Sequence, residues 1–151
     1  MKLRIHHFFD IIRDFGIGKK FDPHPYQHSY HKIASLINDD PNIEIEIIVG
    51  SDAVCEGCIH LTGGHCNDTI SHRKDFTAKE AFNNYLDTRI IEVCEVDVSK
   101  KYSPELLVNL ADRYIQNIRF IYEGNDAEHT EQRKQNVILG LKYYSAKHAI
   151  L

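Results

Sequence analysis

The sequence has neither an excess of basic charge nor a long apolar run. Its 18 lysines and arginines are outnumbered by 22 aspartates and glutamates, which gives a net charge of -4. Because phosphate binding needs a concentrated basic field, we expect neither nucleic acid nor an anionic membrane surface as the main partner. No run approaches the ~18 apolar residues of a membrane span, and charges interrupt the N-terminal segment where a signal peptide would be apolar. These absences predict a cytoplasmic protein.

The common catalytic motifs are also missing. The sequence contains no Ser-His-Asp order, no nucleotide fingerprint and no cysteine triplet of the radical type. The reaction type is therefore left open. The sequence does not indicate the oligomeric state either. The expected partner is an unidentified small molecule or a redox protein.

The spacing of apolar residues predicts a mainly helical chain. At 151 residues it is most simply one domain, residues 1–151, which is long enough to bury a core without a metal or a disulfide. The predicted helices cover residues 8–15, 26–37, 77–94, 103–124 and a stretch after Asp126. Gly16 is expected to cap the first helix, Pro25 to lie in the first turn of the second, and residues 77–80 to form a capping box.

One segment has the alternation of a strand. Apolar and polar residues alternate over 43–49, and residues 2–5 or 93–98 are the candidate partner strands. Together with the helices, this predicts an α+β fold that is mostly helical, with about five helices, a small sheet and a long loop that carries cysteines.

That loop, residues 50–76, has no apolar periodicity and holds Cys55, Cys58 and Cys66, three of the four cysteines. A loop this long in a compact domain is either disordered or tied down by something. In a reducing cytosol, clustered cysteines more often bind metal or act in catalysis than form disulfides. The alternative is that a cysteine is simply a small buried apolar residue. This role fits the three loop cysteines poorly, whereas for Cys94 it is as good an explanation as a ligand role.

The arrangement favours an iron-sulfur cluster over zinc. Zinc draws four sulfurs into one tetrahedron and usually takes them from two tight pairs, whereas this chain has one pair, Cys55 and Cys58, and two single cysteines. A cluster spreads its ligands over several irons, so dispersed thiolates fit it more easily. The expectation is a cluster of the 4Fe-4S type with a redox or catalytic role. The alternative is a zinc-stabilised protein-interaction domain without catalysis.

The chain also resembles a known family. The start Leu3-Arg4-Ile5-His6-His7, the run 49–52 and the pattern Cys55-x2-Cys58-x-His60 with Gly64-x-Cys66 resemble a family of small uncharacterised prokaryotic proteins. Members are sometimes labelled iron-sulfur binding, so the resemblance implies that the three loop cysteines are ligands.

The chain departs from the family pattern at the fourth ligand. The family commonly has a cysteine three residues after the paired histidines, and Asp10 occupies that place here. Cys94 is the first choice as the fourth ligand, with Asp10 or a histidine as substitutes. If none of them binds, one iron stays open to substrate.

Ten histidines form the last unusual feature. On a helix, His28 and His31 would lie opposite the apolar stripe, with His24 aligned just before them. They could form an ordinary solvated face. The alternative is that His24, His28 and His31, together with His7 near the N-terminus, face a substrate cleft and transfer protons there, or bind a second metal.

Overall fold

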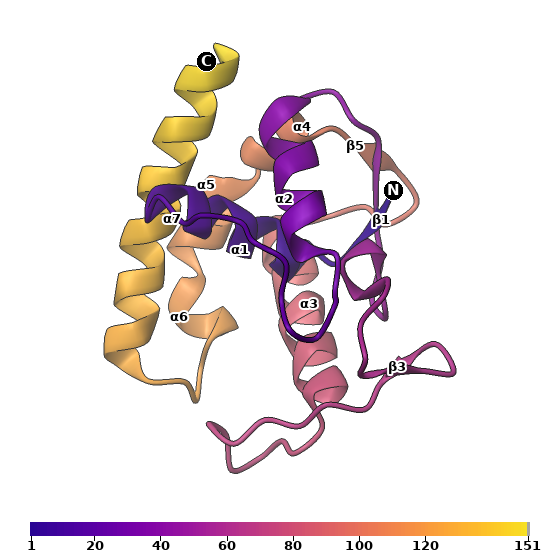
Figure 1. Ribbon diagram of the computed structural model, residues 1–151. Helices are drawn as coiled ribbons and strands as arrows, with labels where there is room; N and C mark the ends of the chain where they lie inside the picture. The colour runs from indigo at the N-terminus through magenta and orange to yellow at the C-terminus, as the bar shows by residue number, and fades with distance from the viewer. Residues whose placement is uncertain (151) are drawn as a thin grey trace.

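The computed structural model describes residues 1–150, and its elements confirm an α+β fold that is mostly helical (Figure 1). The helices are α1 (Ile5–Gly16), α2 (Tyr30–Asp39), the 3-10 helix η1 (Ala53–Cys55), α3 (Lys79–Cys94), α4 (Pro104–Val108), α5 (Ala111–Gln116), α6 (Ile118–Ile121) and α7 (Ala127–His148). The strands are β1 (Lys2–Leu3), β2 (Ile45–Ile47), β3 (Leu61–Thr62), β4 (His65–Cys66) and β5 (Lys101–Tyr102).

The strands form two small sheets. In the first, β2 lies between β1, to which it is parallel, and β5, to which it is antiparallel. The predicted strand therefore exists, although only its centre is paired, and one of its two candidate partners is right. The other candidate, 93–98, is wrong, because the second partner comes slightly later in the chain. The second sheet is the hairpin of β3 and β4 inside the cysteine loop.

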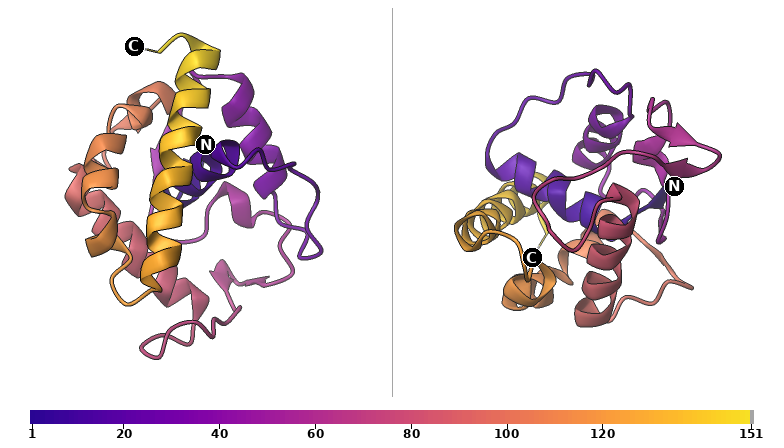
Figure 2. Two further views of the ribbon diagram at one scale, coloured as in Figure 1. Left: turned by 90° about the vertical axis from the view of Figure 1, so that its left-hand side faces the viewer. Right: turned by 90° about the horizontal axis from the view of Figure 1, so that it is seen from below.

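The first and last helices pack closely against each other, and Figure 2 shows α7 lying across α1. Two glycines permit the crossing. A methyl group on Gly140 would lie 1.7 Å from the carbonyl oxygen of Ile12, and one on Gly16 would lie 1.9 Å from that of Asn136. Gly16 is thus the last residue of α1 and a contact point for α7, and Ile17 takes the predicted capping position.

The core is built around α1, whose side chains contact those of α2, α3, α5 and α7. Phe9 stacks on Tyr114 of α5 with ring centroids 3.9 Å apart, and Phe8 and Ile12 are fully buried. Burial of each such side chain is worth roughly 1.5–3 kcal/mol. The N-terminal helix is therefore held in place by packing, and this fixes where its polar residues point.

Three helix predictions need correction. The second helix begins at Tyr30, four residues after the predicted start, so Pro25 lies outside it. The third has Ala78 as its N-cap with no side-chain cap, so the capping box does not form. The fourth is broken into α4, α5 and α6. The helix after Asp126 is confirmed, with the Asp126 side chain accepting a hydrogen bond from the backbone N–H of His129.

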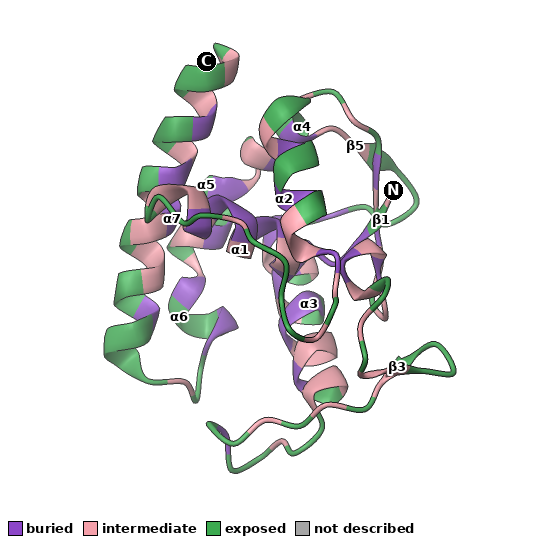
Figure 3. Ribbon diagram, viewed as in Figure 1, coloured by how far each residue is buried: buried purple, intermediate pink, exposed green. Residues whose placement is uncertain are grey.

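No helix among residues 1–150 is long and apolar enough to cross a membrane. Burial is uneven along the chain. Figure 3 shows much of the cysteine loop as exposed or half-buried, in contrast to the buried inner faces of the helices.

Candidate functional site

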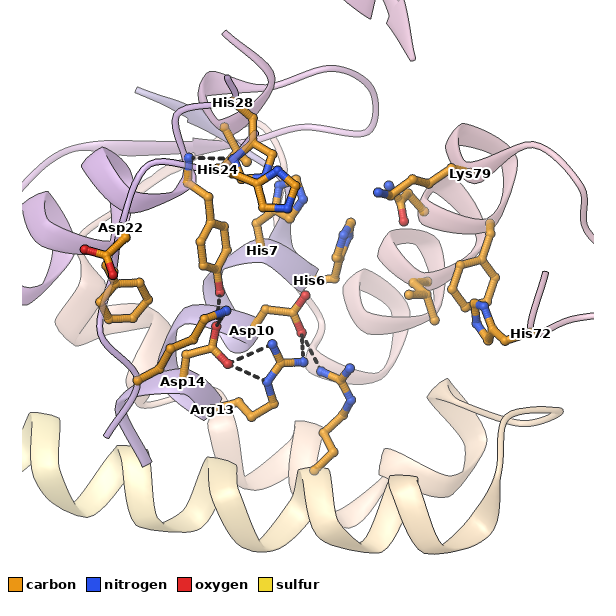
Figure 4. A pocket seen from close by; sticks show the side chains of 18 of the residues that line it. His6, His7, Asp10, Arg13, Asp14, Asp22, His24, His28, His72 and Lys79 are labelled. Carbon is orange, nitrogen blue, oxygen red and sulfur yellow. Dashed lines mark hydrogen bonds and ion pairs between the residues drawn. The ribbon is translucent and has the colours of Figure 1, made fainter. Parts of the chain in front are cut away.

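A cleft of about 610 Å³ opens between α1, the segment that precedes α2, α3 and α7 (Figure 4). Five of the ten histidines line it: His6, His7, His24, His28 and His72. Three of the four predicted catalytic histidines, His7, His24 and His28, are thus brought together. The fourth, His31, is on α2 and does not line the cleft.

Each histidine at the start of α1 is anchored by a buried carboxylate. Nδ1 of His6 donates to Asp87 of α3 at 2.8 Å, and Nδ1 of His7 donates to Asp52 at 2.8 Å. Both carboxylates are fully buried. The two imidazole rings lie side by side with centroids 4.3 Å apart. The pairs fix the orientation of both rings and leave each Nε2 as the free nitrogen.

The buried carboxylates are stabilised as anions. Burial alone would raise the pKa of Asp52, but His7 and the backbone N–H of Arg4 outweigh it and lower that pKa to about 2. Asp87 also accepts from the Arg4 guanidinium at 2.7 Å, and its pKa is lowered despite its burial by His6 and then Arg4. Burial opposes protonation of His7 in turn, but Asp52 prevails and raises its pKa. A raised pKa makes Nε2 of His7 a stronger proton acceptor.

The second pair of cleft histidines is held differently. Nδ1 of His24 accepts the backbone N–H of Tyr26 at 3.0 Å, and Nδ1 of His28 accepts that of Tyr30 at 3.4 Å. Their rings stack with centroids 4.4 Å apart, and Figure 4 shows them beside His7. Burial and then the neighbouring His24 lower the pKa of His28, which favours its neutral form.

The wall of the cleft formed by α1 and α7 is an ion-pair network. Asp10 is bound by both Arg13 and Arg133, and these arginines hold its pKa well below the usual range although burial acts the other way. Asp14 accepts from Arg13 at 2.8 Å and from the hydroxyl of Tyr30 at 2.7 Å. Asp10, a candidate substitute ligand, is therefore already occupied by two cations.

The cysteine loop folds by short turns. The backbone N–H of Cys58 donates to the carbonyl of Cys55 at 3.0 Å, and that of Leu61 donates to the carbonyl of Cys58 at 3.1 Å. Gly63 and Gly64 then reverse the chain with positive φ, so that Cys66 pairs with Leu61 across the hairpin. Cys55, Cys58 and Cys66 are free thiols and half-buried.

The loop is joined to the cleft. Oδ1 of Asp52 lies 3.4 Å from Sγ of Cys55, while Oδ2 of the same carboxylate holds His7. The backbone N–H of Ile59 donates to Tyr26 in the segment between His24 and His28, at 2.8 Å. Burial raises the pKa of the Cys55 thiol to about 11, and the Asp52 carboxylate contributes. The loop and the cleft thus share Asp52 and one stretch of backbone.

Cys94 lies elsewhere. It ends α3, is fully buried, and its carbonyl accepts from Arg113 of α5. The start of α3 is the end near the loop, because Glu80 contacts His65 next to Cys66. Fourteen residues of helix separate Glu80 from Cys94, a rise of ~21 Å. The structure does not bring Cys94 to the three loop cysteines, and within residues 1–150 no group of three or more histidine, cysteine or acidic side chains is arranged as a ready metal site.

The comparison with protein families gives one match. The model of the family described as "Protein of unknown function (DUF1284)" matches residues 24–124. The chain belongs to this family. An uncharacterised family is therefore confirmed, and the iron-sulfur label stays a prediction. The DUF1284 match includes the cysteine loop and Asp87 but begins after His6 and His7. No curated protein and no solved structure matches the chain.

Sequence reasoning missed Asp87 and the two arginines, Arg13 and Arg133. Asp87 had a signal, because it lies on the same stripe of α3 as the buried residues Leu86, Ile90 and Cys94. An acidic residue on a buried stripe needs a partner. The arginines carry no such signal, since arginine on an amphipathic helix is ordinary.

Proposed function

We propose that this DUF1284 protein binds an iron-sulfur cluster of the 4Fe-4S type through Cys55, Cys58 and Cys66, and that the neighbouring histidine cleft serves its redox or catalytic role. The proposal rests chiefly on one observation. Three free, half-buried thiols occupy a single short segment that is joined through Asp52 to the cleft.

The donor set fits such a cluster in its chemistry. Thiolates are the ligands that iron-sulfur clusters prefer. The three loop cysteines lie on successive turns of one glycine-rich segment. A cluster must displace the proton of Cys55, whose pKa is raised without a metal, so binding should release protons and weaken in acid. When bound, the cluster would supply one-electron transfer or an open iron.

The fourth ligand is the point at which the proposal departs from the four-cysteine set. Cys94 is buried against α5 at the far end of α3, and Asp10 is held by two arginines. We therefore assign three cysteine ligands and leave one iron for a ligand that is not a cysteine.

The histidines of the cleft would transfer protons. His7, with Asp52 on Nδ1, is suited to take a proton from a molecule in the cleft, and His24 and His28 are suited to donate hydrogen bonds to it. His31 does not line the cleft, so we give it no part in this step.

Anaerobic purification and metal analysis test the proposal. We expect brown protein with iron and acid-labile sulfide, and loss of both in Cys55→Ser, Cys58→Ser or Cys66→Ser. Cys94→Ala is the matched control and should keep the cluster. Colourless protein with one bound zinc would replace the proposal with the zinc-stabilised interaction domain, and loss of the cluster in Cys94→Ala would restore the four-cysteine set.

A further inference from the structure

The four histidines that face the cleft from α1 and from the segment before α2 divide into two kinds. A carboxylate can only accept, so Nδ1 of His6 and of His7 carries a proton, and in the neutral form of each ring Nε2 presents a lone pair. A backbone amide can only donate, so Nδ1 of His24 and of His28 is the acceptor and their neutral rings carry the proton on Nε2. The cleft therefore offers two adjacent acceptors and, beside His7, two adjacent donors.

Charge in the cleft runs against that of the whole chain. The chain carries -4, yet the residues that line the cleft include five lysines and arginines and three aspartates. Asp10 pairs with Arg13 and Arg133, and Asp14 pairs with Arg13 and Lys19, so three cations on this wall share two anions. Lys20 adds a cation at the rim, where its side chain is 87% exposed and only loosely paired with Asp22 at 3.8 Å. An anion is therefore favoured inside the cleft.

An imidazole anchored by a carboxylate has two common uses, as a metal ligand and as an acceptor for a ligand's proton. Here the number of ligands decides between them. A bound divalent metal needs more protein ligands than two imidazoles, and within residues 1–150 no group of three or more histidine, cysteine or acidic side chains is placed to supply them. The two lone pairs are better satisfied by a hydroxyl group.

We propose that the cleft binds a small hydroxylated organic anion, such as a hydroxy acid or a sugar phosphate. Its hydroxyl donates to Nε2 of His7 or His6, and its anionic group accepts from Nε2–H of His24 and His28 and is attracted by Lys20. The cleft volume of about 610 Å³ suits a ligand of this size. The site requires no cluster in the cysteine loop. The inference can therefore be tested independently of the proposed function.

Calorimetric titration near neutral pH and low ionic strength tests the inference with four probes. Malate and glycerol 3-phosphate carry both groups, succinate lacks the hydroxyl, and glycerol lacks the charge. We expect at least one of the first two to bind saturably, at least about tenfold more tightly than succinate or glycerol, because a buried acceptor left without its donor costs about 1.4 kcal/mol or more. Added salt should weaken the binding.

Variants locate the site. Asparagine can keep a donor beside the buried carboxylate while removing Nε2 from the cleft, so His6→Asn with His7→Asn should weaken binding about tenfold or more. Lys20→Glu, on an exposed side chain, should weaken it without any folding defect. His129→Asn is the matched control, because His129 is exposed on α7 outside the cleft lining. Removal of any bound metal with a chelator should leave the binding unchanged, whatever the outcome for the cluster.

Two results would overturn the inference. One is the absence of saturable heat with every probe up to about 10 mM, or equal binding of malate and succinate together with equal binding of glycerol 3-phosphate and glycerol. The other is tight binding of one equivalent of Zn²⁺ that disappears with His6 and His7, which would make the pair a metal site.

Discussion

The cysteine loop and the start of α1 carry the most reactive side chains of the protein, and they are held in opposite ways. Turns of backbone order the loop, and its thiols are half-exposed. Side chains order the start of α1, where His6 and His7 are fixed by fully buried carboxylates that lie 81 and 45 residues further along the chain. The loop is local and adaptable, whereas the floor of the cleft is assembled from distant segments.

This difference teaches where a ligand is needed. A segment held by its own turns loses little when it rearranges, so a cluster can complete it. The carboxylate-histidine pairs already satisfy each other's buried groups, so they persist without a ligand. Substitutions at the carboxylate-histidine pairs should therefore lower the stability of the protein. Substitutions in the cysteine loop should lower only its capacity to bind a cluster.

The largest effect is expected from Asp87→Asn. The substitution removes the charge that compensates Arg4, whose side chain is 1% exposed, and a buried charge left unpaired costs about 3–5 kcal/mol of unfolding free energy. Urea denaturation measures it. Glu44→Gln, on an exposed ion pair with Lys101, should change stability little. Equal effects of the two would remove the contrast between buried and surface pairs.

The next effect compares two glycines. Gly140→Ala forces a methyl group against the backbone of Ile12 and should cost about 3 kcal/mol, because neither helix backbone can yield easily. Gly63→Ala meets no atom within 4 Å in the hairpin of the cysteine loop, and its positive φ of 57° should cost only about 1 kcal/mol. Thermal unfolding of both variants would show the opposite order if the loop were the more rigid region.

Acid should act first on Asp52, the carboxylate that joins the cleft to the loop. The folded pKa of Asp52, about 2, is below its usual 3.8, so its contribution is present above pH 3.8 and is lost as the pH falls through 3.8 toward 2. The loss should reach about 2 kcal/mol. Denaturation at a series of pH values in the parent and in Asp52→Asn measures it. The same decline in both proteins would assign the acid sensitivity to other carboxylates.

The smallest effect is expected in the loop itself. In metal-free protein, Cys58→Ser should change the unfolding free energy by less than about 0.5 kcal/mol, since the thiol is half-exposed and lies outside the hydrophobic core. Limited proteolysis should cut within residues 50–76 in both proteins. Cys94→Ser, which buries a hydroxyl, should cost about 1–3 kcal/mol. A stability loss for Cys58→Ser as large as that for Cys94→Ser would place the loop in the core.

What could be read from the sequence follows the same division. Local signals succeeded: the helix after Asp126, the central strand and the cysteine turn all arise from residues close in sequence. Helical spacing failed for the second helix, because Pro25 and Gln27, with a φ of 63°, belong to a turn that presents His24 and His28 to the cleft. The histidines of the cleft were among the predicted residues, but its carboxylates and arginines could not be assigned to it, since they meet only through tertiary packing.

The crossing of α1 and α7 has a consequence for how the protein is made. A ribosome releases α1 first, and more than a hundred residues must follow before α7 can cover it. Until α7 has been synthesised, the apolar face of α1, with Ile12 and Phe15, lacks the helix against which it packs in the folded protein. The packing of α1 is thus completed only after α7 has been made, and such long-range closure is expected to slow folding and to leave an apolar face exposed in the nascent chain.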